Sequence, residues 1–314
     1  MVNSNIKISF VIPCYRSEQT IRAVVEEIRD AVSQRGQFDY EIILVDDFSP
    51  DGTYEVIKQL TLEDMQIHGL SFSKNFGQHS ALMAGLRKSS GEIVVCLDDD
   101  GQTPANEVFR LVDMLDHDTD VVYASYQYSG KQHSIFRNIG SAINNWMLRI
   151  LLSKPKGLEI TSFFAAKRYV INEVCKYVNP FPYAIGLILQ TTDSIKNVSV
   201  NHRARLAGRS GYTFKKLLHL WLNGFTAFSV RPLRVASALG GMFSLVGFLF
   251  AIYLIIRKIV VPTVPMGYSS IMAGLIFIGG MLMLMLGMLG EYVGRIYISI
   301  NRNPQYVIRR DTDK

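Results

Sequence analysis

Cysteine and tryptophan are scarce in this chain, and their scarcity narrows the classes of protein to consider. The 314 residues include three cysteines and two tryptophans. Cys14, Cys96 and Cys175 stand far apart in the sequence, which argues against both a disulfide framework and a zinc site. Cys14 and Cys96 lie in or beside apolar runs, a position typical of small buried residues.

Two common nucleotide-binding signatures are also missing. No G-x-G-x-x-G follows the first apolar run, residues 7–13, and the chain contains no P-loop. A classical dinucleotide fold or a P-loop nucleotidase would therefore lack its phosphate-binding loop here. A polar lead precedes that apolar run, so we expect no secretory signal peptide.

Acidic residues are missing between His202 and Arg234, a stretch that holds seven Lys and Arg side chains. This basic block adjoins a hydrophobic segment, and the combination indicates contact with an anionic membrane surface or a phosphate ligand. Nucleic acid is the less favoured partner, because no helix-turn-helix, zinc-finger or RNA-binding signature accompanies the block.

Two long runs without charge follow the basic block. Residues 235–256 and 269–290 each form an uncharged run of 22 residues. As helices they would each reach about 33 Å, enough to cross a bilayer core. A pair of buried core helices is the alternative, but the short Pro-containing connection favours a membrane hairpin. Glycines along both runs would allow close helix packing, within the hairpin or in a homo-oligomer.

The basic residues around these runs predict their orientation. Within 20 residues, four Lys or Arg precede the first run, two lie between the runs and four follow the second. The positive-inside rule therefore places both flanks in the cytoplasm, at the inner membrane of a prokaryotic cell.

The segment directly before the hairpin, residues 212–230, has apolar side chains at helical spacing. They are Phe214, Leu217, Leu218, Trp221, Phe225 and Phe228. The pattern favours an amphipathic helix lying in the membrane interface, with an ordinary core helix as the alternative.

The N-terminal two thirds of the chain alternate between strand and helix patterns. Apolar runs suited to buried strands occupy residues 7–13, 41–47, 92–100 and 120–125. Helical patterns occupy residues 17–33, 52–64, 78–89 and 104–117. Unbroken apolar strands that alternate with helices predict an α/β fold, with a mostly parallel sheet covered by helices on both faces.

Carboxylates stand where two of these strands end. Asp46 and Asp47 end one strand, and Asp98, Asp99 and Asp100 end another, followed by Gln102. Ligands of such sheets bind beyond the carboxyl ends of the strands. Oxygen ligands suit Mg²⁺ or Mn²⁺, which commonly bridge to substrate phosphates. A solvated acidic turn is the alternative, but the second carboxylate pair favours a metal and diphosphate site.

The chain resembles the family 2 glycosyltransferases that act on polyprenyl phosphates. The resemblance rests on six motifs in the expected order: VIPCY, VDDFSPDGT, SKNFGQHSALMAGL, LDDDGQTP, RLAGRSGY and MLGEYVGRIY. Similar groups are the bactoprenol glucosyltransferases, the undecaprenyl-phosphate aminoarabinose transferases and the dolichol-phosphate mannose synthases. The resemblance covers residues 7 to about 308. It implies a GT-A (Rossmann-like) fold, a nucleotide-sugar donor (UDP-linked by family weight), a divalent metal and a polyprenyl phosphate acceptor such as undecaprenyl phosphate.

The resemblance also implies roles for individual residues. Asp98, Asp100 and Gln102 would hold the metal and the diphosphate. Pro13, Tyr15, Asp46 and Asp47 would bind the nucleotide sugar. Arg137, Ser141, Arg205 and Ser210 would meet the acceptor phosphate, with Gly208 in the same motif as Arg205. Arg203 and Arg209 are further candidates for that phosphate, or solvated charges.

This chain departs from the family pattern at several positions. Arg16 and Ser17 stand where many relatives have Asn-Glu. Asp99 replaces a usual Ala, Gly101 a usual Leu, and Gly211 a common Lys. These departures bear on the choice of donor and leave the expected metal ligands in place.

The expected mechanism follows from the acceptor. A monoalkyl phosphate has a second pKa of about 6, so it is already ionised and attacks without a protein base. Arg137 and Arg205 would hold it while the metal takes the leaving diphosphate. Asp99 is the candidate base if the acceptor is instead a hydroxyl. The family precedent is inversion at the anomeric carbon.

Two other functions were weighed against this transferase. A processive polysaccharide synthase usually carries a Q-x-x-R-W type motif, and neither Trp146 nor Trp221 follows Q-x-x-R. A membrane-anchored nucleotide-sugar sensor would tolerate loss of Arg137 and Arg205.

The expected domain organisation has four parts. Residues 1–211 form the cytoplasmic catalytic domain, and residues 212–234 form the juxtamembrane segment. Residues 235–290 form the two spans, and residues 291–314 form a cytoplasmic tail.

Overall fold

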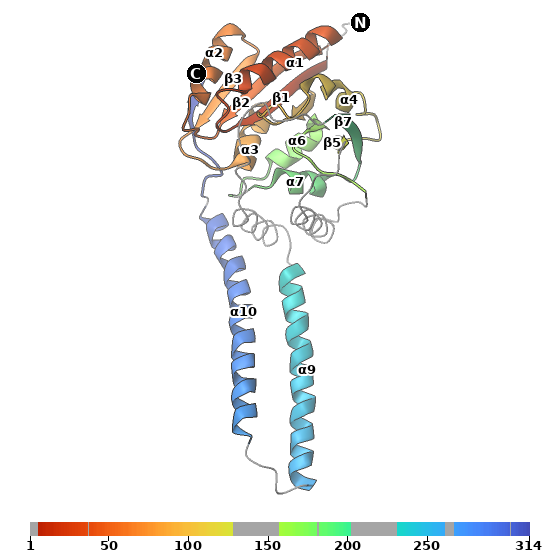
Figure 1. Ribbon diagram of the computed structural model, residues 1–314, viewed down its shortest axis with the longest axis vertical. Helices are drawn as coiled ribbons and strands as arrows, with labels where there is room; N and C mark the ends of the chain where they lie inside the picture. The colour runs from red at the N-terminus through yellow and green to blue at the C-terminus, as the bar shows by residue number, and fades with distance from the viewer. Residues whose placement is uncertain are drawn as a thin grey trace. The chain divides into compact units, whose positions relative to one another are not determined.

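The computed structural model describes residues 6–36, 38–127, 157–180, 182–201, 231–260, 267–301 and 303–314. It divides into two compact units. The sheet unit comprises residues 1–213 and 302–314, and the hairpin unit comprises residues 214–301. Each unit is described by itself below (Figure 1).

The sheet unit is built on one mixed, mostly parallel sheet with the strand order β7-β5-β6-β4-β1-β2-β3-β8. Its strands are β1 (Ile6–Cys14), β2 (Phe38–Asp46), β3 (Ile67–Phe72), β4 (Ile93–Cys96), β5 (Val121–Gln127), β6 (Phe164–Lys167), β7 (Ile195–Asn201) and β8 (Ile308–Asp311). Strand β1 pairs in parallel with β2 and β4, β2 with β3, and β5 with β7. Strand β6 is antiparallel to β4 and β5, and β8 is antiparallel to β3.

Helices cover both faces of this sheet. They are α1 (Ile21–Arg35), α2 (Thr53–Glu63), α3 (Gln78–Lys88), η1 (Ala105–Glu107), α4 (Val108–Val112), α6 (Arg168–Cys175) and α7 (Ala184–Thr191). Side chains of α1, α2 and α4 join alternate residues of β1 and β2 in one core cluster. Helix α3 packs on the other face of these strands, where a Cβ on Gly85 would collide with the side chain of Val11. The α/β prediction with both faces covered is confirmed. The central strands β1, β2 and β4 are mostly apolar because neither face of the sheet meets water there.

Several elements differ from the sequence prediction. The helix predicted over residues 104–117 is a 3-10 turn, η1, followed by the short helix α4. The helix predicted from residue 17 begins at Ile21, because residues 17–20 form a turn in which Ser17 accepts the N–H of Thr20. Strands β3, β6, β7 and β8 were not assigned from the sequence.

The last residues of the chain belong to the sheet unit. Strand β8 pairs with β3. The guanidinium of Arg87 on α3 holds the residues that precede β8 in place. Arg87 donates to Gln305 Oε1 at 2.9 Å, to the hydroxyl of Tyr306 at 3.0 Å and to the carbonyl of Tyr177 at 2.6 Å. The predicted tail, residues 291–314, contains the last turns of the second long helix, which ends at Ile300, and the strand β8.

The hairpin unit contains two long helices, α9 (Arg231–Val260) and α10 (Tyr268–Ile300). The predicted spans, residues 235–256 and 269–290, lie inside them. The ring centroids of Phe243 and Phe277 are 5.6 Å apart, and Gly240 lies next to the side chain of Met285. The two helices therefore contact each other at these positions. Many of their large apolar side chains are exposed.

Length and composition mark one stretch of the described residues as a candidate membrane span. It is Phe277–Gly294, with a mean hydropathy of 1.5, and Gly240–Phe250 is a shorter apolar stretch on α9. The predicted interfacial helix, residues 212–230, lies outside the described residues.

Candidate active site

The candidate site lies at the carboxyl edge of β1, β2 and β4. Because the three strands are parallel neighbours, the segments that leave them meet at one edge of the sheet. These segments are the donor loop (residues 13–17), the β2–α2 loop (residues 47–52) and the acidic turn (residues 97–102).

The acidic turn holds its three carboxylates in different directions. Asp98 accepts a hydrogen bond from Gln78 Nε2 at 3.1 Å and another from the hydroxyl of Ser162, just before β6. Asp100 accepts the backbone N–H of Gln102 at 3.0 Å, which closes the turn. Gly101 adopts φ 71°, a left-handed conformation that glycine takes without strain. The Leu that the family resemblance implies at this position would be strained there.

Asp99 points toward the donor loop. One of its oxygens, Oδ2, accepts the backbone N–H of Tyr15 at 2.9 Å and also the hydroxyl of Ser17. Burial raises the pKa of this carboxyl, and the hydrogen bonds from Ser17 and Tyr15 oppose that rise. These partners differ from those of Asp98 and Asp100.

Asp46 and Asp47 are buried beneath the site, with exposed fractions of 2% and 3%. Asp46 accepts the N–H of Ser49 at 2.9 Å and the hydroxyl of Ser71 at 2.7 Å. These hydrogen bonds connect the end of β2 to its own following loop and to β3.

Asp47 fixes the loop that leads into α3. Its two oxygens accept the N–H groups of Phe76 at 2.7 Å and Gly77 at 2.8 Å. Burial raises its pKa to about 6, against the opposing effect of these two N–H groups. Because Gln78 follows directly and bonds Asp98, Asp47 supports the acidic turn from a distance. The family resemblance implies a nucleotide contact for Asp46 and Asp47, whereas in the structure both carboxylates accept hydrogen bonds from protein groups.

The donor loop presents an exposed aromatic ring. Tyr15 is 46% exposed, and the guanidinium of Arg16 lies 5.5 Å from the centre of its ring. Pro13 lies partly buried at the end of β1. Arg16 has φ 60°, and Phe48 in the neighbouring β2–α2 loop has φ 57°. Left-handed conformations at residues other than glycine are strained and cluster at functional sites.

Three partners of the acidic turn escaped the sequence prediction: Ser17, Gln78 and Ser162. Gln78 lies within SKNFGQHSALMAGL, one of the motifs that carry the family resemblance, so its position carries a signal. Ser17 stands out in the sequence only as a departure from the family pattern. Ser162 had no local signal, since it reaches Asp98 across 64 residues of sequence.

The acceptor residues predicted from the sequence lie outside the described residues. They are Arg137, Ser141, Arg205, Gly208 and Ser210, together with Arg203 and Arg209. The structure therefore neither joins them to the acidic turn nor separates them from it.

The donor set of the acidic turn suits a hard divalent cation. Asp98, Asp100 and Gln102 offer only oxygen at the open edge of the sheet, the chemistry that Mg²⁺ and Mn²⁺ prefer. No three His, Cys, Asp or Glu side chains of the described residues are grouped to hold a metal by themselves. A cation here would complete its coordination with water or with a ligand's phosphates, as Mg²⁺ commonly does.

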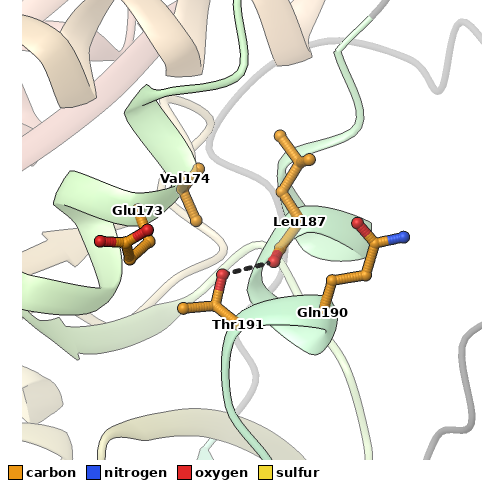
Figure 2. A pocket seen from close by; sticks show the side chains of 5 residues that line it. All are labelled: Glu173, Val174, Leu187, Gln190 and Thr191. Carbon is orange, nitrogen blue, oxygen red and sulfur yellow. Dashed lines mark hydrogen bonds between the residues drawn. The ribbon is translucent and has the colours of Figure 1, made fainter.

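A small cavity of about 330 Å³ lies elsewhere, between α6 and α7. Figure 2 shows its lining residues, Glu173, Val174, Leu187, Gln190 and Thr191. The hydroxyl of Thr191 donates to the carbonyl of Leu187 at 2.9 Å, an ordinary bond within a helix. None of these residues belongs to the loops that make up the candidate site.

A mostly parallel sheet with carboxylate-bearing loops at the ends of its first strands is the arrangement expected of the GT-A fold. A family model for glycosyl transferase family 2 matches residues 9–175, and a model of the GtrB C-terminal hairpin matches residues 231–296. The chain belongs to glycosyl transferase family 2. The expected family and enzyme class are thereby confirmed.

Curated relatives match nearly the whole chain. An undecaprenyl-phosphate 4-deoxy-4-formamido-L-arabinose transferase of Proteus mirabilis is 32% identical over 310 residues, covering 97% of this chain and 93% of the relative. An SfII prophage-derived bactoprenol glucosyl transferase of Shigella flexneri is 30% identical over 310 residues, covering 97% and 98%.

Solved structures support the fold. Glucosyl-3-phosphoglycerate synthase from Mycobacterium tuberculosis, in complex with Mn²⁺ and uridine-diphosphate-glucose, superposes with a TM-score of 0.54 at 20% identity. That match covers 71% of this chain and 78% of the synthase chain.

Proposed function

We propose that this protein transfers one sugar from a nucleotide sugar, UDP-linked, to undecaprenyl phosphate at the cytoplasmic face of the inner membrane. The observation that carries the proposal is the open, all-oxygen acidic turn beside the exposed ring of Tyr15, on a chain that also carries an apolar hairpin. Relatives named for undecaprenyl phosphate and bactoprenol transfer support the acceptor. The structural neighbour named with Mn²⁺ and UDP-glucose agrees with a metal-dependent nucleotide-sugar donor.

The bound metal, Mg²⁺ or Mn²⁺, would neutralise charge on the leaving diphosphate. Asp98, Asp100 and Gln102 are the residues that would hold it. The nucleotide would lie against Tyr15 and Pro13, at the end of β1. Asp46 and Asp47 would shape that pocket from below, since both carboxylates are buried and bonded to protein groups.

In the proposed reaction an oxygen of the lipid phosphate attacks the anomeric carbon of the sugar. The bond from that carbon to the nucleoside diphosphate breaks, the diphosphate leaves with the electron pair, and the configuration inverts. A dianionic phosphate brings no proton that must be removed, so the step requires no protein base. Asp99 is bonded to Tyr15 and Ser17, and this favours a structural use of its carboxylate over a role as base.

Arg137 and Arg205 are proposed to hold the attacking phosphate, with Ser141 and Ser210 as further contacts. A guanidinium presents two parallel N–H donors to a phosphate, so it both neutralises and orients the nucleophile. Arg205→Lys keeps the charge and removes this fork.

A donor panel tests the proposal. Purified full-length protein in detergent is incubated with undecaprenyl phosphate, Mn²⁺ and radiolabelled UDP-, GDP- or dTDP-sugars. We expect a lipid carrying a single sugar that mild acid releases. Arg205→Lys should lower turnover and leave nucleotide binding largely intact. Arg137→Ala should raise the Michaelis constant for the lipid more than that for the donor.

Arg110→Lys is the matched control in that panel, because Arg110 is exposed and pairs only with neighbouring Glu107 in the described contacts. Longer glycan products would favour a processive synthase, and nucleotide binding without any transfer would favour a sensor. Either result would overturn the proposed function.

The proposed topology places both ends of the hairpin in the cytoplasm. A cysteine introduced at Thr263 should react from outside the cell with a membrane-impermeant reagent, whereas one at Thr312 should not. The reverse labelling pattern would contradict the orientation.

A further inference from the structure

Three consecutive backbone N–H groups of the donor loop are bonded to side chains from outside that loop. The N–H of Tyr15 bonds Asp99 of the acidic turn at 2.9 Å. The N–H of Arg16 bonds Ser49 Oγ at 3.1 Å, and the N–H of Ser17 bonds Thr53 Oγ1 at 2.8 Å. These hydrogen bonds connect the donor loop to the β2–α2 loop and the start of α2 on one side, and to the acidic turn on the other.

Asp99 connects the acidic turn to the donor loop, and it does so through two hydrogen bonds. The same carboxylate oxygen accepts the N–H of Tyr15 and the hydroxyl of Ser17, so it bonds the residues on either side of Arg16. Arg16 itself has the left-handed φ of 60°. Such a conformation persists only where its surroundings over-determine it. Loss of the Asp99 carboxylate would therefore free the loop at its most strained residue.

Ser17 and Asp99 are also two of the positions at which this chain departs from the family resemblance. Residues 82 positions apart in the sequence prove to be hydrogen-bonded partners. The family resemblance stated above implies Glu and Ala at these two positions, where this chain has Ser and Asp. In both cases the two positions together carry one carboxylate. In this chain it belongs to the acidic turn, at position 99, and not to the donor loop, at position 17. The exchange also conserves the number of heavy atoms, because Glu exceeds Ser by as many as Asp exceeds Ala.

We propose that Asp99 is a positioning residue that joins the donor loop to the acidic turn, and that Ser17 is its dedicated partner. This inference rests on the proposed function, since it assigns the donor loop to the nucleotide sugar. Asp99 would hold Tyr15 where its exposed ring meets the donor, and Asp98 and Asp100 would be the carboxylates that hold the metal. The pair sets donor affinity and takes no part in proton transfer.

A double-mutant cycle tests the pair in the full-length protein. The variants are Asp99→Ala, Ser17→Glu and the double variant that carries both. Asp64→Ala is the matched control, because Asp64 also accepts a backbone N–H, from Gln66, and a hydroxyl, from Tyr40. Asp64 precedes β3, at the opposite edge of the sheet.

Two kinds of measurement are made on each protein. The first is a kinetic assay, which gives the Michaelis constant and turnover number for the nucleotide sugar that supports wild-type transfer. The second is hydrogen–deuterium exchange of the peptide covering residues 12–19, recorded without nucleotide or metal. The exchange measurement does not depend on activity, and Asp64→Ala reports the effect of losing a similar carboxylate elsewhere.

Asp99→Ala should raise the donor Michaelis constant by about tenfold or more, because it removes two hydrogen bonds to a charged acceptor. It should also speed exchange of the 12–19 peptide. Ser17→Glu alone should be worse, since it sets a second carboxylate against Asp99. The double variant should regain a Michaelis constant within about threefold of the wild type and restore slow exchange, whereas Asp64→Ala should leave both quantities unchanged.

A double variant no better than the worse single variant would overturn the inference. Wild-type exchange and affinity in Asp99→Ala would do the same. A loss of turnover in Asp99→Ala with an unchanged donor Michaelis constant and unchanged exchange would point to a base and also refute the positioning role. A wild-type protein that transfers no sugar to lipid would refute the proposed function. Hydrogen–deuterium exchange across the double-mutant cycle would still decide whether Ser17 and Asp99 connect the donor loop to the acidic turn.

Discussion

The buried carboxylate of Asp47 should make the sheet unit more stable at acidic pH than at neutral pH. Burial raises its pKa to about 6, above the ordinary value of 3.8. The native state therefore binds the proton more tightly than the unfolded chain does. Stability from this group is fully present below about pH 3.8 and is lost as the pH rises through about 6. Its full size is about 3 kcal/mol, since one pKa unit corresponds to about 1.4 kcal/mol.

The test is Asp47→Asn, compared with the wild type by thermal unfolding between pH 4 and 7.5 without ligands. For a unit of this size, about 3 kcal/mol corresponds to about 6–12 °C in the unfolding midpoint. The wild type should gain about that much relative to the variant as the pH falls. At pH 7.5 the variant loses one hydrogen bond to Phe76 or Gly77 but no longer buries a charge, so the two midpoints should be close.

Stability is a better readout here than rate. The second pKa of an alkyl phosphate is also about 6, so a rate profile would mix the lipid with Asp47. Glu41 offers a control of opposite sign. Although burial opposes it, the hydrogen bonds from Lys7, Ser9 and Ser90 lower its pKa to about 2. Glu41→Gln should therefore remove stability that is present above about pH 4.5 and lost in acid. If Asp47→Asn keeps the wild-type slope between pH 4 and 6.5, the account of Asp47 is wrong.

Two further predictions follow from the acidic turn and from the last strand. Asp100→Asn should lower turnover by at least about 10²-fold, and EDTA should abolish turnover until Mn²⁺ or Mg²⁺ is added; full activity in EDTA would contradict the metal site. Arg87→Ala should speed amide exchange in residues 303–314 by at least about tenfold, because it leaves Gln305 and a carbonyl without their charged donor. Lys88→Ala should change that exchange less, because its ion pairs with Asp311 and Asp313 are partly exposed. Equal effects of the two substitutions would argue against the guanidinium as the main contact.

The central strands could be predicted from the sequence because their apolar runs are unbroken. β1, β2, β4 and β5 were assigned in this way, and their order placed Asp46 and Asp98 at one edge of the sheet. Strand β8 could not be found by the same means. Its sequence, IRRD, is charged and mostly exposed, and it becomes a strand because β3 offers an unpaired edge.

The types of residue in the candidate site could be predicted, but their partners could not. Three adjacent aspartates indicated a cation, and the structure gives each a different direction. The bond between Asp99 and Ser17 joins two loops that are 82 residues apart. No local pattern reports such a contact, because it depends on the pairing of β1 with β4.

The position of β8 in the chain has a consequence for biosynthesis. A ribosome makes β1 to β7 first, then α9 and α10, and only afterwards the strand that covers the edge of β3. Until then β3 presents unpaired backbone groups, which invite pairing with other chains. Domains fold as they emerge during synthesis. The sheet unit therefore cannot complete its last edge before both apolar helices have been made, so the pairing of β8 with β3 is the last step in the folding of the sheet.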